Sequence, residues 1–494
     1  MRVASLLALL LASAVASAEG DPSDAPLMRT SVTGYLDSRL TYSDVPTGRL
    51  FPSSDVPSLA SVTEGNFQLK LRWGDKALLY VDDSLFYQAG GMFYDAGPDG
   101  KRSSVADHAV ASLQPMNVIS ELYGTYDFGD HAVFTIGKKR LVWGPGFAQN
   151  PTDILNPPKD PTDPAFQRAG SWLAWLEFPF DTFTLSFVGA AQTLEQSAGA
   201  PSALLYYPQY EQDAAKATPA VPTNVDGFPH FATAARLYWL WHDTDINLFY
   251  FFTDRFNDAF EHKHRAGASL SHVFGNWEVH FEGLAQTGSA RRYANEECLA
   301  DVGALAACAL SDPKSIAARS RLTDSTFTPR VLLGARYTTE NNGMLSLEYY
   351  FVGDGYTQTE FKDFVQLVKL GRELPGASAL LPQLLGQSVD PGSPQKFSFD
   401  PLRRHYAFLS WQEPQIDDDF TLGLTLVENL QDLSGVIAPS LAWSVRDWLT
   451  LTAAAFVSFP GPDALAVQVD GKSYDEYGLA PTSWSAYFSA RAFY

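Results

Sequence analysis

The chain ends in SWSAYFSARAFY, Ser483–Tyr494, and this stretch decides the fold. Its residues alternate between two sets. One set is apolar or aromatic and consists of Trp484, Ala486, Phe488, Ala490, Ala492 and Tyr494; the other is mostly polar and consists of Ser483, Ser485, Tyr487, Ser489, Arg491 and Phe493. A period of two places the sets on opposite faces of a strand. Such a strand fits a membrane wall with lipid on one side and water on the other; the alternative is an amphipathic strand of a soluble sandwich.

The first residues favour the membrane interpretation. A short basic start, Met1-Arg2, is followed by the apolar run Val3–Val15 and by the small residues Ala16-Ser17-Ala18. This order is typical of a secretory signal peptide. The expected division is a signal peptide over residues 1–18, a periplasmic N-terminal segment over 19–30 and an outer-membrane barrel over 31–494. No run of about 18 apolar residues follows, so no helix is expected to span a bilayer.

Composition excludes several functional classes. The chain has 494 residues without an evident interdomain linker, so one large barrel is the economical interpretation. Its formal net charge of −21 argues against nucleic-acid binding, because phosphate binding needs clustered Lys and Arg. The only two cysteines, Cys298 and Cys308, share one polar stretch. In an exported chain we expect them to form a local disulfide rather than a metal site.

Alternating segments recur along the whole chain and predict an antiparallel up-and-down barrel of roughly 18 strands, a size that leaves an aqueous channel. The predicted strands are 31–43, 65–73, 76–88, 117–128, 131–139, 171–180, 182–190, 232–241, 245–253, 264–274, 277–289, 328–338, 344–351, 404–412, 420–428, 435–444, 447–459 and 483–494.

The connections between these segments differ in length according to their order. Connections after even-numbered strands are short, as at Gly74-Asp75, Gly275-Asn276 and Val445-Arg446, whereas those after odd-numbered strands are mostly long. Short periplasmic turns and long extracellular loops distinguish the two ends of an outer-membrane barrel. A soluble sandwich has no reason to sort its loops in this way.

The polar register of each strand defines an expected lumen, because polar groups facing lipid are costly. Asp83 and His272 fall in the apolar register, so we expect each to lie at a rim or at a bulge. Basic and acidic residues nearly balance in the lumen register, where charges either pair with each other or meet a solute. Aromatic residues there either stack on a solute or fill space. The candidates for the channel lining are Arg39, Arg72, Arg236, Arg336, Tyr123 and Trp175.

One local motif follows the fifth strand. It reads GKKRLVWGPG from Gly137 to Gly146 and continues through Asn150-Pro151-Thr152-Asp153 to Pro164. Proline at this density prevents regular ladder pairing and stiffens the chain, and Asn-Pro and Asp-Pro steps favour capped turns. We therefore expect a stiff loop that folds inward and narrows the channel. Its candidate residues are Lys138, Lys139, Arg140, Trp143, Asp153 and Asp160.

This motif carries a resemblance to known barrels. A strand ending in Gly-x-x-x-x-x-Trp-Gly, followed by Asn-Pro-x-Asp and Asn-Pro, resembles bacterial outer-membrane barrels of the alginate-export type and the 18-stranded barrels that partner periplasmic polysaccharide-export proteins. It is also similar to barrels linked to the movement of hydrophobic compounds. The terminal aromatic strand resembles the signal read by the barrel-assembly machinery. Alginate exporters resemble arginine-lined tubes, and the balanced lumen of this chain departs from that pattern.

The resemblance implies an outer-membrane conduit, surrounded by lipid, that translocates a neutral or mixed polysaccharide with a periplasmic export partner. The acidic turn Asp417-Asp418-Asp419 is a candidate contact for that partner. The alternatives are a channel for hydrophobic small molecules and a non-conducting structural or assembly barrel.

A long insertion, Val352 to Arg403, interrupts the strands. Apolar residues at helical spacing predict a helix over Thr359 to Glu373, and a second short helix is expected over Ala377 to Leu385. The helices lie either over the channel as a lid or on the outer rim.

Motifs for catalysis are missing from the sequence. Neither Gly-x-Ser-x-Gly in a strand-turn-helix setting nor His-Glu-x-x-His occurs. Glu261-His262-Lys263-His264 offers metal-ligand types but is read as a solvated loop. We therefore expect no enzyme activity, no cofactor and no bound metal.

Overall fold

The computed structural model describes most of the strand segments and part of the connections. The described residues are 28–44, 59–92, 94–96, 102–104, 115–129, 131–156, 170–191, 231–253, 264–287, 293–311, 316, 326–373, 401–417, 419–479 and 482–494. The expected signal peptide, the expected helix over Ala377 to Leu385 and the candidate Asp160 lie outside this part of the chain.

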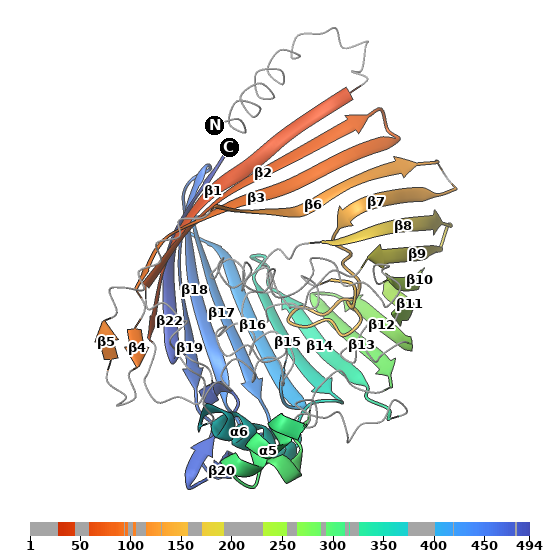
Figure 1. The fold of residues 1–494 in the computed structure, drawn as a ribbon. Coiled ribbons are helices and arrows are strands. Elements are labelled where there is room, and N and C mark those ends of the chain that lie inside the picture. Colours follow the sequence, from red (N-terminus) through yellow and green to blue (C-terminus); the bar gives the residue numbers. More distant parts are fainter. Residues whose placement is uncertain are drawn as a thin grey trace.

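The fold is a closed antiparallel barrel of 18 strands (Figure 1). Each strand pairs with its neighbour in the chain, and the last strand pairs with the first, Asp37 opposite Arg491. Closure gives each of the 18 described barrel strands a neighbour on both sides, which a membrane wall requires because lipid offers no hydrogen bonds. The strands are β1 (Met28–Asp44), β2 (Leu59–Trp73), β3 (Ala77–Met92), β6 (Pro115–Asp127), β7 (Val133–Lys139), β8 (Ser171–Pro179), β9 (Phe183–Ala191), β10 (Phe231–Trp241), β11 (Thr244–Thr253), β12 (His264–Phe274), β13 (Trp277–Gln286), β14 (Arg330–Thr338), β15 (Met344–Val352), β16 (His405–Ile416), β17 (Phe420–Asn429), β18 (Gly435–Arg446), β19 (Leu449–Phe459) and β22 (Trp484–Phe493).

These strands confirm the predicted all-β, up-and-down architecture. β1 begins at Met28, ahead of the expected start at residue 31, and β2 begins at Leu59, ahead of residue 65. Every other predicted segment overlaps an observed strand. The short connections gather at one end, together with the last residues of the chain, and the long connections gather at the other (Figure 1). We call these the turn end and the loop end.

The outer face of the barrel is an apolar band. Its middle exposes aliphatic and aromatic side chains, among them Leu36, Ile136, Leu248, Leu347 and Phe488. Exposed aromatic residues border the band near the turn end, at Trp73, Phe128, Phe180, Trp241, Phe274 and Trp277, and near the loop end, at Tyr42, Tyr87, Trp172, Tyr250 and Trp484. Soluble proteins rarely expose so continuous an apolar surface, whereas membrane barrels have such a band between two aromatic girdles.

The two polar residues in the outward register have local explanations. Asp83 lies at a shift of register between β3 and β6, and its carboxylate accepts a hydrogen bond from Asn117 Nδ2 at 3.0 Å. His272 lies near the turn end, with its Nδ1 2.8 Å from Thr244 Oγ1. The bulge and the rim position that the sequence suggested are both present.

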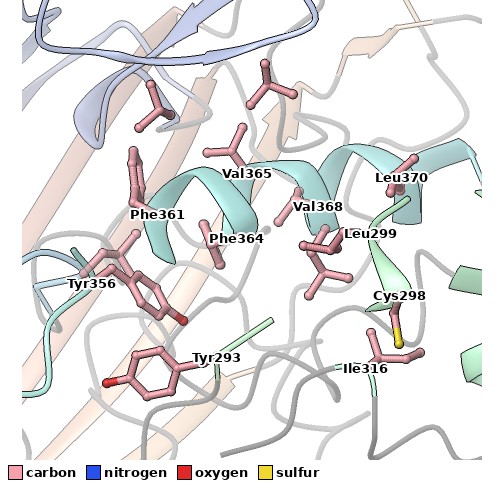
Figure 2. Packing of buried hydrophobic residues seen from close by; sticks show 14 of the residues in the cluster. Tyr293, Cys298, Leu299, Ile316, Tyr356, Phe361, Phe364, Val365, Val368 and Leu370 are labelled. Atoms are coloured by element: carbon pink, nitrogen blue, oxygen red, sulfur yellow. The ribbon is translucent and has the colours of Figure 1, made fainter. Parts of the chain in front are cut away.

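The two α-helices in the described part of the chain lie beyond the loop end (Figure 1). The helix α6 (Gln358–Glu373) packs its apolar side on a cluster that includes Tyr293, Leu299 and Ile316 (Figure 2). Cys298 of the 3₁₀ helix η3 (Glu296–Cys298) and Leu305 of α5 (Val302–Ser311) belong to this cluster, and Val302 and Cys308 pack against it. Cys298 and Cys308 form a disulfide. The small hairpins are β4 (Tyr94–Ala96) with β5 (Arg102–Ser104) and β20 (Val467–Val469) with β21 (Lys472–Tyr474), and a further 3₁₀ turn is η6 (Tyr477–Leu479). Among the described residues, no helix has the length and apolar character needed to cross a bilayer.

The terminal residue closes the seam between β22 and β1. Tyr494 Oη donates to the carbonyl oxygen of Asn66 in β2 at 2.6 Å, so the ring crosses over Gly34 in β1. A Cβ at Gly34 would collide with both the tyrosine hydroxyl and the Asn66 carbonyl oxygen.

Gly34→Ala is therefore expected to displace the Tyr494 ring and to lower the free energy of unfolding by about 1–3 kcal/mol, the usual cost of overpacking. The measurement is urea unfolding of the refolded protein in detergent, followed by tryptophan fluorescence. Gly189→Ala is the matched control, because a Cβ at Gly189 meets open space. Equal stability of the two variants would contradict the role of the seam.

Candidate functional site: a loop folded into the barrel

The connection after β7 turns into the barrel. Its described part, residues 140–156, lies against inward-facing side chains of β8 to β15, and we call it the inward loop (Figure 1). The chain leaves the wall after Lys139, the last residue of β7. Two residues earlier, Gly137 has φ +131°, and a Cβ there would collide with the backbone of Leu122 and Tyr123. Only glycine tolerates this conformation and this approach. β7 has seven residues, whereas its neighbour β6 has thirteen and continues further toward the loop end. The inward loop therefore begins partway along the wall rather than at its rim.

Glu282 of β13 holds the middle of the inward loop. Its carboxylate is fully buried and accepts four hydrogen bonds from the loop. Oε1 accepts from Gly146 N at 2.6 Å and from Asn150 Nδ2 at 2.8 Å. Oε2 accepts from Thr152 N at 3.3 Å and from Thr152 Oγ1 at 2.8 Å. These bonds replace the water that a buried carboxylate loses.

Gly144 and Gly146 make this arrangement possible. A Cβ on either residue would collide with the Glu282 carboxylate, and Gly144 has φ +90°. Pro145 stands between them and has no N–H, so it leaves no donor unpaired at that point. The Gly-Pro-Gly step therefore brings the chain close enough for its N–H groups to reach the acid.

Glu348 of β15 holds the tip of the inward loop. Its two oxygens accept from successive backbone N–H groups, Phe147 N at 2.5 Å and Ala148 N at 2.8 Å. Successive N–H groups of this kind form an anion-binding nest. His280 of β13 lies 2.9 Å from the same carboxylate through its Nε2. All three of Glu348, His280 and Ala148 are buried.

The base of the inward loop is tied to itself and to β8. Asn156 Nδ2 donates to the carbonyl oxygen of Leu141 and to Asp153 Oδ1, and Asn156 Oδ1 accepts from Leu141 N at 3.3 Å. Ser171 of β8 donates through its hydroxyl to the carbonyl oxygen of Leu155. The Asn-Pro-Thr-Asp segment is a turn closed by a bond from Asp153 N to Asn150 O at 3.1 Å. Asp153 is thus a structural residue of the loop.

Apolar side chains of the inward loop fill the space next to the wall. Trp143 is buried, and its ring lies 5.7 Å from Phe249 and 6.0 Å from Phe251 of β11. Leu141 and Leu155 join the same cluster. The aromatic residues on this wall therefore pack against the loop, which is the space-filling alternative that the sequence left open.

Three cations border the inward loop. Arg236 of β10 lies over the Trp143 ring at 5.8 Å and donates to Asn247 Oδ1 at 2.8 Å. Arg336 of β14 lies over the Phe147 ring at 5.5 Å and pairs with Glu278 at 3.2 Å.

Lys139, the third cation, lies between two of the predicted aromatic residues. Its Nζ is 4.4 Å from the Tyr123 ring centre and 4.8 Å from the Trp175 ring centre. Both separations are within the range of cation–π attraction. Next to it, Arg140 Nη2 is 3.5 Å from the Glu121 carboxylate, and Arg140 N also donates to Glu121 at 2.9 Å.

The opposite wall, formed by β22 and β1 to β3, carries two groups of paired polar side chains. Arg491 Nη2 donates to Asp37 at 3.0 Å, and Arg39 lies 3.9 Å from the same carboxylate. Tyr35 Oη and Ser84 Oγ both donate to Glu64, at 2.9 and 2.8 Å. The lumen charges on both walls are thus largely paired within the protein.

The structure separates the predicted channel residues into groups. The inward loop and its border bring together Lys139, Arg140, Trp143, Asp153, Arg236, Arg336, Tyr123 and Trp175. Arg39 belongs to the opposite wall, and Arg72 is exposed near the turn end. Lys138 is buried and shares the outward register of Ile136 rather than the register of Lys139.

The anchoring role of Glu282, Glu348 and His280 was not predicted. The sequence places all three in the lumen register, but nothing near them in the chain points to the inward loop. The only available signal was that acids in the middle of membrane strands need partners. Among the described residues, no group of three or more His, Cys, Asp or Glu side chains is arranged to hold a metal ion.

Glu282→Gln is expected to weaken the attachment of the inward loop. The amide Nε2 of glutamine is a donor, so either the Gly146 and Asn150 donors or the Thr152 donors lose their acceptor, at about 1–3 kcal/mol for each buried group. Hydrogen exchange should show faster exchange at Gly146 or Thr152. Glu278→Gln is the control, because Glu278 lies on the same strand face and pairs with Arg336 instead. Unchanged protection in Glu282→Gln would rule out the anchor.

Comparison with known proteins finds no matching protein-family model and no matching curated protein. The structure is similar to solved outer-membrane proteins at low sequence identity. With OccAB1 of Acinetobacter baumannii the identity is 9% and the TM-score 0.46, over 94% of this chain and 96% of that one. With OccK7 (OpdD) of Pseudomonas aeruginosa the values are 10% and 0.43, over 94% and 99%. With Salmonella typhi OmpF, solved in complex with daunomycin, they are 7% and 0.39, over 94% and 97%.

Proposed function

We propose that this protein is a bacterial outer-membrane channel for small water-soluble solutes, with the inward loop as its constriction. The observation that carries the proposal is the attachment of the loop to Glu282 and Glu348, which holds residues 144–152 inside the barrel at the middle of the strands. A loop fastened there narrows the passage permanently. Barrels of this strand number otherwise enclose an aqueous channel.

Membrane location is supported by the outer surface and by the first residues of the chain. The apolar band with its two aromatic girdles suits a lipid environment. The expected signal peptide over residues 1–18 suits export, and the terminal Tyr494 suits recognition by the barrel-assembly machinery. In this orientation the turn end is periplasmic and the loop end is extracellular.

The lining favours polar solutes of moderate size. Arg236, Arg336 and Lys139 border the inward loop, and polar side chains cover the opposite wall. The apolar wall near β11 is filled by Trp143, so it offers no free surface there for a hydrophobic compound. No enzymatic role is proposed.

Polysaccharide export, the function first expected from the resemblance, requires a passage wide enough for a polymer chain. It would need the inward loop to move aside, together with a periplasmic partner docked at turns such as that of Asp417 and Asp419. Both aspartates are exposed at the turn end. This function is therefore kept as the second candidate, and conductance distinguishes it from the first.

Single-channel recordings in planar bilayers test the proposal. We expect a steady ohmic current that is reduced by small saccharides. Deletion of residues 140–170 is expected to raise the conductance severalfold, because it removes the constriction. The double variant Glu282→Gln, Glu348→Gln is expected to raise current noise without removing the loop.

Heat-modifiable electrophoretic mobility controls for folding of each variant. A wild-type barrel that conducts only after loop deletion, and then admits long oligosaccharides, would favour partner-gated polysaccharide export. Absence of current in both forms would reject a channel and favour a structural barrel.

A further inference from the structure

A second segment enters the barrel at the loop end. Between β19 and β22, Glu476 and Tyr477 are buried against inward-facing residues of β16 and β17. The Glu476 carboxylate accepts hydrogen bonds from Tyr406 Oη at 2.6 and 2.7 Å, from Asn429 Nδ2 at 2.6 Å and from Leu402 N at 2.9 Å. The segment therefore lies inside the opening of the barrel at the loop end, which we call the mouth. The hydrogen bonds of the Glu476 carboxylate are its main attachment there.

An ionic cluster surrounds this acid. Asp432 accepts from Glu476 N at 3.0 Å and from Ser434 N and Oγ at 3.0 and 2.7 Å. Arg403 lies 3.7 Å from Asp432, donates through its backbone N to Tyr406 Oη at 2.6 Å and through Nη2 to Gln358 of α6 at 2.6 Å. We call Arg403, Tyr406, Asn429, Asp432 and Glu476 the latch; none of the five exposes more than a trace of surface.

The latch joins the barrel to a cap formed by α6 and the β20–β21 hairpin. The Arg403 guanidinium lies 4.6 Å from the Phe361 ring of α6. Gln358 Nε2 of α6 donates to Leu465 O at 3.0 Å, and Lys369 of α6 pairs with Asp470 in the hairpin turn. Phe361, Val365 and Val368, which are labelled in Figure 2, belong to one buried cluster. Val467 and Val469 of the hairpin are members of the same cluster.

The cap also connects to the constriction. Tyr477, next to Glu476, belongs to the same buried cluster as Ala148, whose backbone N–H binds Glu348. Tyr406 of the latch is a third member of that cluster. Movement of the segment around Tyr477 would therefore disturb a cluster that also includes the tip of the inward loop.

The charges of the latch do not balance. Among the described residues, the buried carboxylates of Asp432 and Glu476, with Asp475 next to them, outnumber the one guanidinium beside them, that of Arg403. Arg404 is directed elsewhere, toward Glu360 of α6 at 3.9 Å and Gly355 O at 2.8 Å. The remaining groups that bond the Glu476 carboxylate are neutral: the Tyr406 hydroxyl, the Asn429 amide and the Leu402 N–H. The Ser434 hydroxyl donates to Asp432 instead. An excess of buried negative charge is costly unless a proton neutralises it.

We propose that the latch is a proton-operated switch for the extracellular mouth. With Glu476 protonated, the segment stays in the mouth and the cap stays on the barrel. When Glu476 loses its proton, the buried excess charge releases the segment and opens the mouth. The proposal goes beyond channel activity, because it concerns the cap whether or not the barrel conducts.

The direction of the pH effect follows from the same geometry. Burial first, and then the charge of Asp432, raises the pKa of Glu476 from 4.5 to about 7, and burial also raises the pKa of Asp475. In the released state Glu476 meets water and returns toward its ordinary pKa of 4.5. Protonation of Glu476 therefore stabilises the latched state relative to the released state. This stabilisation is fully present below about pH 4.5 and is lost as the pH rises through about 7.

Hydrogen exchange of the full-length protein in detergent or nanodiscs, from pH 5 to pH 9, tests the latch without requiring a current. After correction for intrinsic exchange rates, amides of residues 465–479 should exchange faster above pH 7 by a factor on the order of 100 or less, the limit set by the pKa difference. Strand amides should show no such change. If the barrel conducts, the open probability should rise over the same pH range.

Two variants and one control make the test specific. Glu476→Gln is neutral at every pH, and it should keep residues 465–479 protected up to pH 9. Asp463→Asn removes the same charge from an exposed position on the same connection, and it should behave like the unaltered protein. Lys369→Ala loosens the cap, so exchange should rise at every pH with an unchanged midpoint near 7; this variant serves if Glu476→Gln does not fold.

Equal corrected exchange at pH 5 and pH 9, or wild-type pH dependence in folded Glu476→Gln, would overturn the proposal. A midpoint that moves away from 7 in Lys369→Ala would also overturn it. Absence of current together with pH-dependent exchange would reject channel function and leave the latch standing.

Discussion

The need to pair every backbone hydrogen-bonding group inside the protein is the constraint on which this structure depends. Lipid supplies no partners, so a wall of strands must close on itself. The pairing of β22 with β1 completes that closure, and the Tyr494 hydroxyl extends it to Asn66 of β2. Closure then divides the side chains, because alternate residues must face either lipid or lumen. The apolar band, the aromatic girdles and the polar interior follow from this division.

The same constraint applies to irregular chain inside the barrel. The inward loop has no ladder to satisfy its N–H groups, and two wall glutamates take that role. Each carboxylate in turn loses water and gains several donors in its place. The exchange explains why glycines at 144 and 146 accompany acids at 282 and 348: the backbone must approach the carboxylate closely enough to bond.

At the loop end, Glu476 repeats this arrangement with a different balance of charge. Glu282 is surrounded by neutral donors, and Glu348 by backbone N–H groups and a histidine. Glu476 also receives several donors, but it shares its surroundings with Asp432 and Asp475 and one arginine. An acid held by neutral donors suits a permanent anchor. An acid held beside other carboxylates is sensitive to protonation, so the two positions suit a fixed constriction and a movable mouth.

The sequence by itself determined the barrel, its approximate strand number, the sorting of its connections and most of the lumen register. It did so because lipid on one face and water on the other require apolar and polar side chains to alternate along each strand, as in Phe420–Asn429. This alternation can be read in each strand separately. It also placed a stiff inward loop after β7, since proline and glycine act on their own backbone. Asp83 and His272 were visible as exceptions for the same reason.

Only the tertiary structure decided what the inward loop binds. Gly146 and Glu282 are separated by 136 positions, and the latch joins residues 402 and 476 across 74. Such contacts depend on which strands face each other across the closed barrel. A local sequence pattern contains no information about this arrangement. The sequence could show that Glu282 and Glu348 lie in the lumen, but their bonding partners exist only after closure brings the loop and the wall together.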